Sequence, residues 1–185
     1  MTQFTNMVET GVLQSYVNIL KEENPAWATD FKDTFGEITI IVPREFINDV
    51  CSSLKNRHGF DMLADLCGAD LGPEEDPRFE VNYHLFSTKH YKRLRLKVLL
   101  SEDDPHVATV TTVWKTANWH ERETYDMFGV IFDGHPALTR ILLPSDFDGH
   151  ALRKDYPLRG YEPYSLTYNQ PLSCTVNKKL ITADN

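Results

Sequence analysis

The chain has 185 residues and a formal net charge of −8 at pH 7, with 41% hydrophobic and 25% charged residues. This length suits one domain, or one domain with a tail, that buries about 70% of the surface of its unfolded chain. The acidic balance argues against a nucleic-acid-binding protein, because holding phosphates requires clustered Lys and Arg.

The first part of the chain predicts a helix, a strand and a second helix. Residues 10–21 carry apolar side chains at helical spacing, and residues 37–42 (EITIIV) form a short run typical of a strand. Pro43 is well placed at the start of the second helix, which should end before Gly59. The side chains expected to face inward from this helix are Phe46, Ile47, Val50, Cys51 and Leu54.

The middle of the chain predicts three strands. Residues 61–71 form the first, and an acidic turn that begins at Gly72-Pro73 separates it from a hairpin with strands over 79–87 and 91–101. Residues 89–97 (KHYKRLRLK) alternate basic with apolar side chains, which indicates a strand with one face in the core. A second interpretation of its basic face is a docking edge for an acidic partner.

Another helix is expected to begin at Asp104-Pro105. Its apolar side would carry Val107, Val110, Val113, Trp114 and Ala117. The order of helix, strand, helix, strands and helix predicts an α+β fold, a mixed, largely antiparallel sheet with helices packed on one face. None of the apolar stretches is long enough to cross a bilayer, and no signal peptide is visible, so membrane association is expected only through partners.

The three cysteines, Cys51, Cys67 and Cys174, are far apart in the sequence and form no CxxC motif. An odd and scattered set is typical of a reducing compartment and argues against disulfides. It also argues against an iron–sulfur cluster, which requires four thiolates, usually closely spaced. Cys51 lies within a helical pattern and is expected to be a small core residue.

Residues 118–129 predict a short helix that is rich in charged and aromatic side chains. Asn118 and Glu121 resemble an N-terminal capping pair, and Gly129 suits the position after the helix end. Arg122 and Asp126 are one turn apart and can pair. Because aromatic residues leave this helix no clean polar side, we expect a surface that is buried against another protein.

Two similar segments follow this helix, residues 132–135 (FDGH) and 147–150 (FDGH). Asp-Gly favours a turn, because Gly accepts positive φ and Asp can bond to its own backbone. The favoured interpretation is two turns that direct aromatic and basic side chains outward. A metal site formed by Asp133, His135, Asp148 and His150 is the less favoured one, since the spacing matches no standard ligand pattern.

From Pro144 onward, prolines interrupt every apolar run and tyrosines recur without a period. We therefore predict a globular domain over 1–143 and an extended, partner-binding C-terminal tail over 144–185. Disordered tails are usually poor in aromatics, whereas Tyr and Arg are enriched where proteins meet. Residues 140–164 are accordingly expected to lie extended across a partner.

The run Glu121-Arg122-Glu123-x-x-Asp126-Met127-Phe128, with His135 and residues 140–142 (RIL), resembles the signature of the 30 kDa subunit of respiratory NADH:quinone oxidoreductase. The letter for this subunit is C in bacteria and J in the photosynthetic relatives of the complex. The resemblance continues through 148–150 and 152–157 to 160–161, and it covers most of the chain from about 61 to 164. Thr139 departs from the family pattern, which usually has a basic residue or proline there.

The resemblance implies a non-catalytic interface subunit of the peripheral, electron-input arm of a proton-translocating complex. Such a subunit packs on the large subunit near the quinone site and carries no cofactor, with iron–sulfur clusters, FMN and quinone in partner subunits. It lies on the cytoplasmic face of the bacterial inner membrane, or the equivalent organelle or thylakoid face. The residues expected at the partner interface are Glu121, Arg122, Glu123, Asp126, His135, Arg140, His150, Arg153, Lys154, Asp155 and Tyr156.

Two other functions stay open. The same module occurs in related complexes, such as a ferredoxin–plastoquinone oxidoreductase or an energy-converting hydrogenase. A stand-alone metal-dependent hydrolase is a further alternative, and it would hold a tightly bound metal in the isolated chain. Its candidate residues are Glu121, Glu123, Asp126, His135 and His150.

Overall fold

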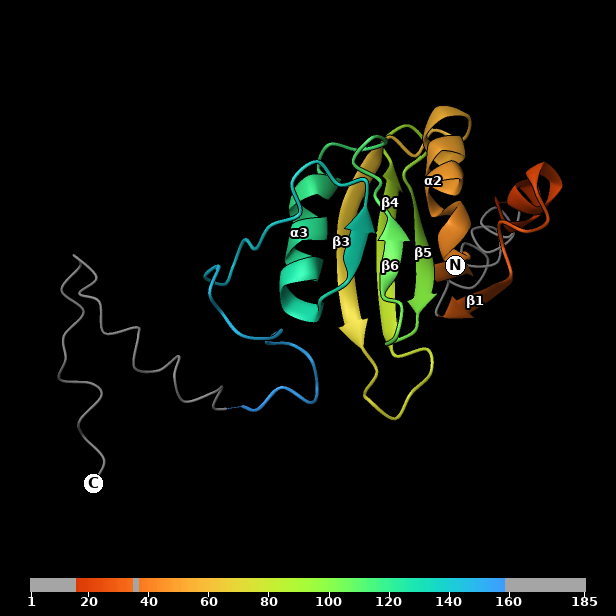
Figure 1. Ribbon diagram of the computed structural model, residues 1–185. Coiled ribbons are helices and arrows are strands. Elements are labelled where there is room, and N and C mark those ends of the chain that lie inside the picture. The colour runs from red at the N-terminus through yellow and green to blue at the C-terminus, as the bar shows by residue number, and fades with distance from the viewer. Residues whose placement is uncertain (1–15, 35–36, 159–185) are drawn as a thin grey trace, which may run out of the picture.

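The computed structural model describes residues 16–34 and 37–158, which form a sheet covered by helices (Figure 1). Five strands lie in the order β1-β2-β5-β4-β3. Every neighbouring pair is antiparallel except β2 and β5, which are parallel, so the predicted mixed, largely antiparallel sheet is confirmed. The strands are β1 (Asp30–Thr34), β2 (Glu37–Ile41), β3 (Met62–Asp70), β4 (Phe79–Ser87) and β5 (Lys92–Leu100).

The two faces of this sheet differ sharply in β4 and β5. Buried and half-exposed residues alternate along both strands, as a half-buried strand requires. The basic strand of the hairpin therefore has one face in the core, as its sequence predicts. The core side chains of these strands are Phe79, Val81, Tyr83, Leu85, Leu94, Leu96, Val98 and Leu100.

The helices lie on the core side of the sheet. Residues 16–23 are helical, and the predicted helix after Pro43 appears as η1 (Arg44–Phe46) followed by α2 (Ile47–Asn56). Asn48 of α2 donates a 2.7 Å hydrogen bond to the carbonyl of Thr109, and Lys55 reaches the carbonyl of Val113. These bonds join α2 to the chain that leads into α3 (Ala117–Phe128), which packs over β3 (Figure 1).

Cys51 is completely buried in α2, which confirms it as a core residue, and Cys67 is exposed on β3. Cys174 lies outside the described residues. So do residues 10–15 of the first predicted helix and residues 159–185 of the predicted tail.

The predicted helix from Asp104-Pro105 is wrong. His106–Ala108 form the strand β6, which pairs in parallel with β7 (Ile131–Asp133), and α3 begins only at Ala117. The apolar spacing of this stretch suits a helix, but β7 supplies a strand partner from more than twenty residues away. Pairing with a distant segment overrides local propensity, and one chain period cannot reveal it.

The predicted N-terminal cap of α3 is also wrong. Thr116 occupies the cap position without a side-chain hydrogen bond, and Asn118 lies inside the helix. The end of α3 matches the sequence prediction, because Gly129 adopts φ 79° and its amide donates to the carbonyl of Tyr125.

Gly68 on β3 permits the close packing of α3 on the sheet. A Cβ atom at this position would lie 2.7 Å from Phe128 and 2.8 Å from Thr124, both on α3. Gly68→Ala should therefore push the helix away and lower the free energy of unfolding by about 1–3 kcal/mol, as overpacking does. Urea denaturation measures this change.

The matched control for Gly68→Ala is Cys67→Ala, one residue earlier on the same strand. Cys67 is exposed, so its replacement should change the free energy of unfolding by no more than about 0.5 kcal/mol. Equal stability of the Gly68→Ala protein and the wild type would contradict the close approach of α3 to β3.

Candidate partner interface

Residues 138–156, here called the return segment, follow β7 and run back along the C-terminal part of α3 (Figure 1). The segment consists of turns and irregular chain, without a helix or strand of its own. Its backbone polar groups therefore need partners from outside a regular ladder. Those partners come largely from the charged side chains that the sequence singles out.

Asp126 on α3 has no exposed side-chain surface and serves as the main anchor of the return segment. Its Oδ2 accepts hydrogen bonds from the amides of Ile141, Leu142 and Leu143 at 3.0, 2.8 and 2.9 Å. Consecutive amides directed at one anion form a nest. Burial alone would raise the pKa of Asp126, but these amides and a guanidinium outweigh it and lower the pKa.

That guanidinium belongs to Arg140, whose Nη1 donates to Asp126 Oδ1 at 2.8 Å. Its Nη2 donates to the carbonyls of Phe147 and Gly149 at 3.0 and 2.9 Å, so one side chain spans both ends of the turn. The predicted pairing of Arg122 with Asp126 is wrong. Arg122 instead donates to the carbonyls of Thr139 and Arg140, because Asp126 faces the return segment.

The return segment also completes the C-terminal end of α3. A helix leaves its last four carbonyls without partners from within the helix. Here the carbonyls of Asp126, Met127 and Phe128 accept hydrogen bonds from His150 Nδ1, the amide of Leu152 and Arg153 Nε. Since Gly129 satisfies Tyr125, the return segment supplies the cap that ends this helix.

A buried ion-pair cluster joins the return segment to the sheet. Arg78 is 1% exposed and donates to both carboxylate oxygens of Asp70 at 3.0 Å. Its Nη2 also donates to Asp155 at 2.8 Å, and the amide of Lys154 donates to Asp70 at 2.7 Å. Burial would raise the pKa of Asp70, but the bonds from Arg78, Lys154 and Gly72 lower it to about 2.

Glu121 is fully buried beneath the start of α3. It accepts a 2.5 Å hydrogen bond from the hydroxyl of Thr109 and a 2.8 Å bond from the amide of Val110. Burial raises the pKa of Glu121 to about 7 despite these bonds. The nearby side chain of His135 is also buried, which lowers its pKa, and it bonds to the carbonyl of Asn118.

No partner contact can be seen in a single chain, so the interface residues named from the sequence stay a prediction. The carboxylates of Glu121 and Asp126 act inside this chain, since neither side chain is exposed. Glu123, Lys154 and Asp155 are exposed, and Tyr156 is half-buried against Phe147, with ring centroids 5.6 Å apart. The remaining predicted residues, Arg122, His135, Arg140, His150 and Arg153, bond to backbone carbonyls.

Large apolar side chains are exposed on the same part of the molecule. Trp119 of α3 is 61% exposed, and Leu142 and Leu152 of the return segment are 61% and 56% exposed. Leu158, just beyond the segment, is fully exposed. Exposed apolar side chains gathered on a rigid framework are typical of a protein contact surface.

The two Asp-Gly segments form turns, with φ of 81° at Gly134 and 84° at Gly149. The expectation that both direct an aromatic side chain outward is wrong for Phe132, which is 2% exposed because it belongs to β7 in the core. Within the described residues, no three His, Cys, Asp or Glu side chains gather closely enough to hold a metal ion.

Sequence reasoning missed Thr109, Asp70 and Arg78 as supports of this region. Thr109 lay in a stretch predicted to be helical, so nothing connected it with Glu121. Arg78 follows an acidic turn, where a solvated cation is the ordinary expectation. Its location immediately before the apolar strand β4 was the available signal, since a strand with a buried first residue can draw its neighbour inward.

A family model described as the 30 kDa subunit of respiratory-chain NADH dehydrogenase matches residues 40–162. The C subunit of NADH-quinone oxidoreductase from Saccharopolyspora erythraea is 53% identical over 127 residues, which are 68% of this chain and 51% of that protein. The chain thus spans about half the length of that relative. The protein of the same name from Geobacter metallireducens is 44% identical over 78% of this chain and 91% of its own length.

Two solved structures have similar folds. A trypsin-resistant fragment of Nqo5, residues 1–134, is 36% identical with a TM-score of 0.56, covering 65% of this chain and 97% of the fragment. A chain from the membrane-bound sulfane sulfur reductase, an archaeal respiratory membrane complex, covers 90% of this chain and 96% of its own length. Its TM-score is 0.67 at 22% identity, which indicates a shared fold alone.

Asp126→Asn should loosen the return segment, because an amide side chain cannot serve both the amide nest and Arg140 as a carboxylate does. We expect the amides of Ile141, Leu142 and Leu143 to exchange with solvent at least tenfold faster, as measured by hydrogen–deuterium exchange. The control is Glu123→Gln, an exposed carboxylate on the same helix, which should leave this exchange unchanged. Unchanged protection of the three amides in Asp126→Asn would remove the anchor role.

Glu121 should make the protein less stable as pH rises. Its pKa is higher in the folded state than the 4.5 typical of an exposed Glu, so its contribution is complete below pH 4.5 and is lost as pH rises through 7. The loss is roughly 3 kcal/mol, from about 1.4 kcal/mol per pKa unit. Glu121→Gln keeps a neutral side chain, so its stability relative to wild type should rise between pH 5 and pH 8.

Urea denaturation at several pH values tests this expectation for Glu121. Comparing the variant with wild type cancels the contributions of other titrating groups, including the histidines. Glu123→Gln is again the control, since its stability relative to wild type should not vary across this pH range. A pH-independent difference for Glu121→Gln would show that the Glu121 carboxyl ionises at its ordinary pH in the folded protein.

Proposed function

Because the chain belongs to the 30 kDa subunit family of respiratory-chain NADH dehydrogenase, we propose that it is a non-catalytic interface subunit of a proton-translocating NADH:quinone oxidoreductase. In this role it packs on the large subunit near the quinone site, in the peripheral arm through which electrons enter. It carries no cofactor itself. Iron–sulfur clusters, FMN and quinone belong to partner subunits, and this chain helps to hold those subunits in position.

The observation that carries this proposal is the way α3 and the return segment are joined. The buried Asp126 carboxylate and the guanidinium of Arg140 fix an irregular segment as firmly as a regular element. Outside that framework, Trp119, Leu142 and Leu152 face solvent. Pre-organised apolar side chains bind a partner without the cost of ordering a flexible loop.

A stand-alone hydrolase is disfavoured by the same geometry. Glu121 and Asp126 are enclosed, and each accepts hydrogen bonds from groups of its own chain. Glu123 lies on the exposed side of α3, away from both. The acids therefore do not converge on a common space where a metal and a water could sit.

We further propose that the chain attaches to the cytoplasmic face of the membrane through its partners. Over the described residues, no helix has both the length and the apolar character needed to cross a bilayer. The same module in a ferredoxin-linked or hydrogenase-type complex would use the same docking surface, because those complexes differ in their electron donor. Identification of the co-purifying electron-input subunits distinguishes these assemblies.

The double variant Leu142→Asp/Leu152→Asp should prevent assembly without unfolding the chain. Both side chains are more than half exposed, so carboxylates there are solvated in the free protein and desolvated only at an interface. We expect at least a tenfold loss of the large subunit recovered with a tagged chain in mild detergent. Circular dichroism should show an unchanged melting temperature.

Ala26→Asp is the matched control for this assembly test. Ala26 is exposed on the turn after the first helix, at the opposite end of the molecule from α3 (Figure 1). It introduces a new carboxylate far from the proposed interface and should leave recovery of the large subunit unchanged. Normal assembly of the double variant would reject the proposed docking surface.

A further inference from the structure

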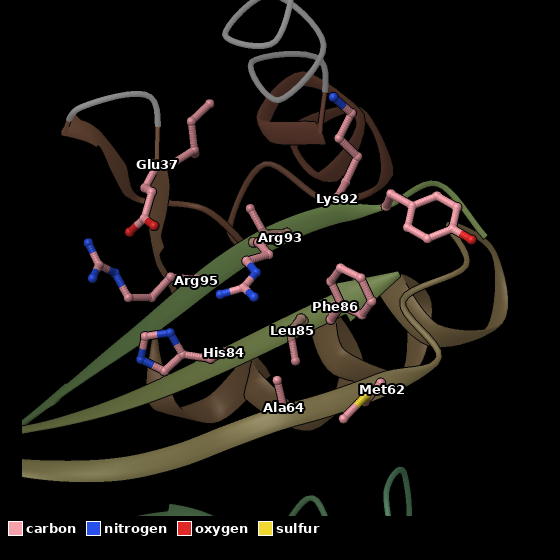
Figure 2. Close-up of a pocket in the computed structure, with 12 residues that line it drawn as sticks. Glu37, Met62, Ala64, His84, Leu85, Phe86, Lys92, Arg93 and Arg95 are labelled. Atoms are coloured by element: carbon pink, nitrogen blue, oxygen red, sulfur yellow. The ribbon is translucent and has the colours of Figure 1, made fainter. Parts of the chain in front are cut away.

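The side of β4 and β5 that faces away from the helices is half-exposed along its length. At one end of this open face, the surface is hollowed into a pocket of about 460 Å³ (Figure 2). The pocket belongs to the basic strand that the sequence offers as a possible docking edge. It lies on the opposite face of the sheet from α3, so the interface proposed above leaves it unused.

Strand register explains how the pocket is built. Met62, Phe86 and Arg93 are direct neighbours across β3, β4 and β5, and the guanidinium of Arg93 lies 5.9 Å from the centre of the Phe86 ring. In the next row, His84 neighbours Arg95. The register of β3 shifts by one residue between Leu63 and Asp65, a bulge of the kind that often adjoins functional sites.

The charge of this pocket is opposite to that of the chain. Lys92, Arg93, Arg95 and His84 line it, and Glu37 is the one carboxylate among the described lining residues. Arg95 Nε donates to the hydroxyl of Thr39 at 2.7 Å, and the contact found for Arg93 is the aromatic ring of Phe86. By contrast, Lys97 on the same face pairs with Glu80 at 2.6 Å.

Two guanidinium groups thus lie on this face without a carboxylate ion pair among the described residues, in a chain of net charge −8. Guanidinium groups bind carboxylates and phosphates strongly through paired N–H donors. A phosphate site usually adds backbone amides from a helix N-terminus or a nest. The lining residues here lie mainly on paired strands, whose amides are already engaged in the sheet ladder.

The apolar part of the pocket also favours a protein as the occupant. Met62 is 48% exposed and Tyr91 is 82% exposed, with Phe86 between the strands that carry them. Arg, Met and aromatic residues are the types enriched in protein interfaces. Hot spots typically combine an apolar or aromatic pocket with Arg at its edge.

We propose that this pocket is a second docking site, which binds an acidic segment of a partner protein. An apolar side chain of that segment packs on Phe86 and Met62, and its flanking carboxylates bind Arg93 and Arg95. The proposal goes beyond the function given above, because it assigns a partner to the open face of the sheet. It depends on no contact made by α3 or the return segment.

Peptide binding to the full chain provides the first test. The probe is a fluorescein-labelled peptide of sequence EDLEFDE, and its counterpart KKLKFKK carries Lys at each acidic position. Fluorescence anisotropy should show saturable binding of the acidic peptide alone. Arg93→Glu should weaken binding at least tenfold, and Phe86→Ala should weaken it with the net charge unchanged.

The matched control is Arg57→Glu, which changes the net charge equally at an exposed position near the end of α2. The side chain of Arg57 is 68% exposed and outside the pocket, so binding should stay within twofold of wild type. Equal weakening by Arg57→Glu and Arg93→Glu would mean general charge attraction and overturn the proposal. So would absence of binding, or complete competition by 10 mM inorganic phosphate at constant ionic strength.

Photo-cross-linking in cells tests the native partner. A benzoylphenylalanine residue replaces Tyr91 at the pocket rim, and mass spectrometry identifies the cross-linked peptide. The expected product is a peptide segment in which Asp and Glu outnumber Lys and Arg around an apolar residue, and its yield should fall with Arg93→Glu. A cross-link to lipid, to nucleic acid or to a basic segment overturns the proposal.

Discussion

The carboxylate of Asp126 is the contact on which the return segment depends. A buried charge without partners costs several kcal/mol, and here the charge is balanced by three consecutive amides and the guanidinium of Arg140. The return segment has no strand or helix to satisfy its backbone. Its order is therefore supplied by side chains that bond to main-chain atoms, with Arg122, His150 and Arg153 continuing the same pattern.

This arrangement divides the charged stretch after β6 into two roles. Buried acids and half-buried cations hold the chain in place, whereas exposed apolar side chains are available to a partner. The division is physically sensible because an ion pair exposed at an interface gains little, and a buried pair contributes most when all its hydrogen bonds are satisfied. The density of charge in the sequence thus reflects internal support, and Leu142 and Leu152 account better for the proposed contact with the large subunit.

The sheet separates two surfaces of different chemistry. On the helix side, α3 approaches β3 closely enough that only glycine fits at position 68. On the open side, Arg93 and Arg95 give a positive surface to a chain that is acidic as a whole. A small protein with two such surfaces can contact two different segments of its surroundings, one through apolar packing and one through charge.

The sequence by itself determined the elements whose signals are local. The alternation in β4 and β5, the helix after Pro43, the core position of Cys51 and the cap at Gly129 follow from the chain period and from glycine's freedom at positive φ. The family signature likewise depends only on residue order. Each of these features is encoded within a few neighbouring residues, so no distant partner is needed to predict it.

Only the tertiary structure decided which charges meet. Asp126 bonds to Arg140 fourteen residues away, and Asp70 accepts from the amide of Lys154 across 84 residues. The strand β6 exists because β7 lies beside it, and Glu121 is buried because Thr109 and Val110 come to meet it. Such pairings depend on how the chain folds back on itself, and periodicity along the chain carries no information about that path.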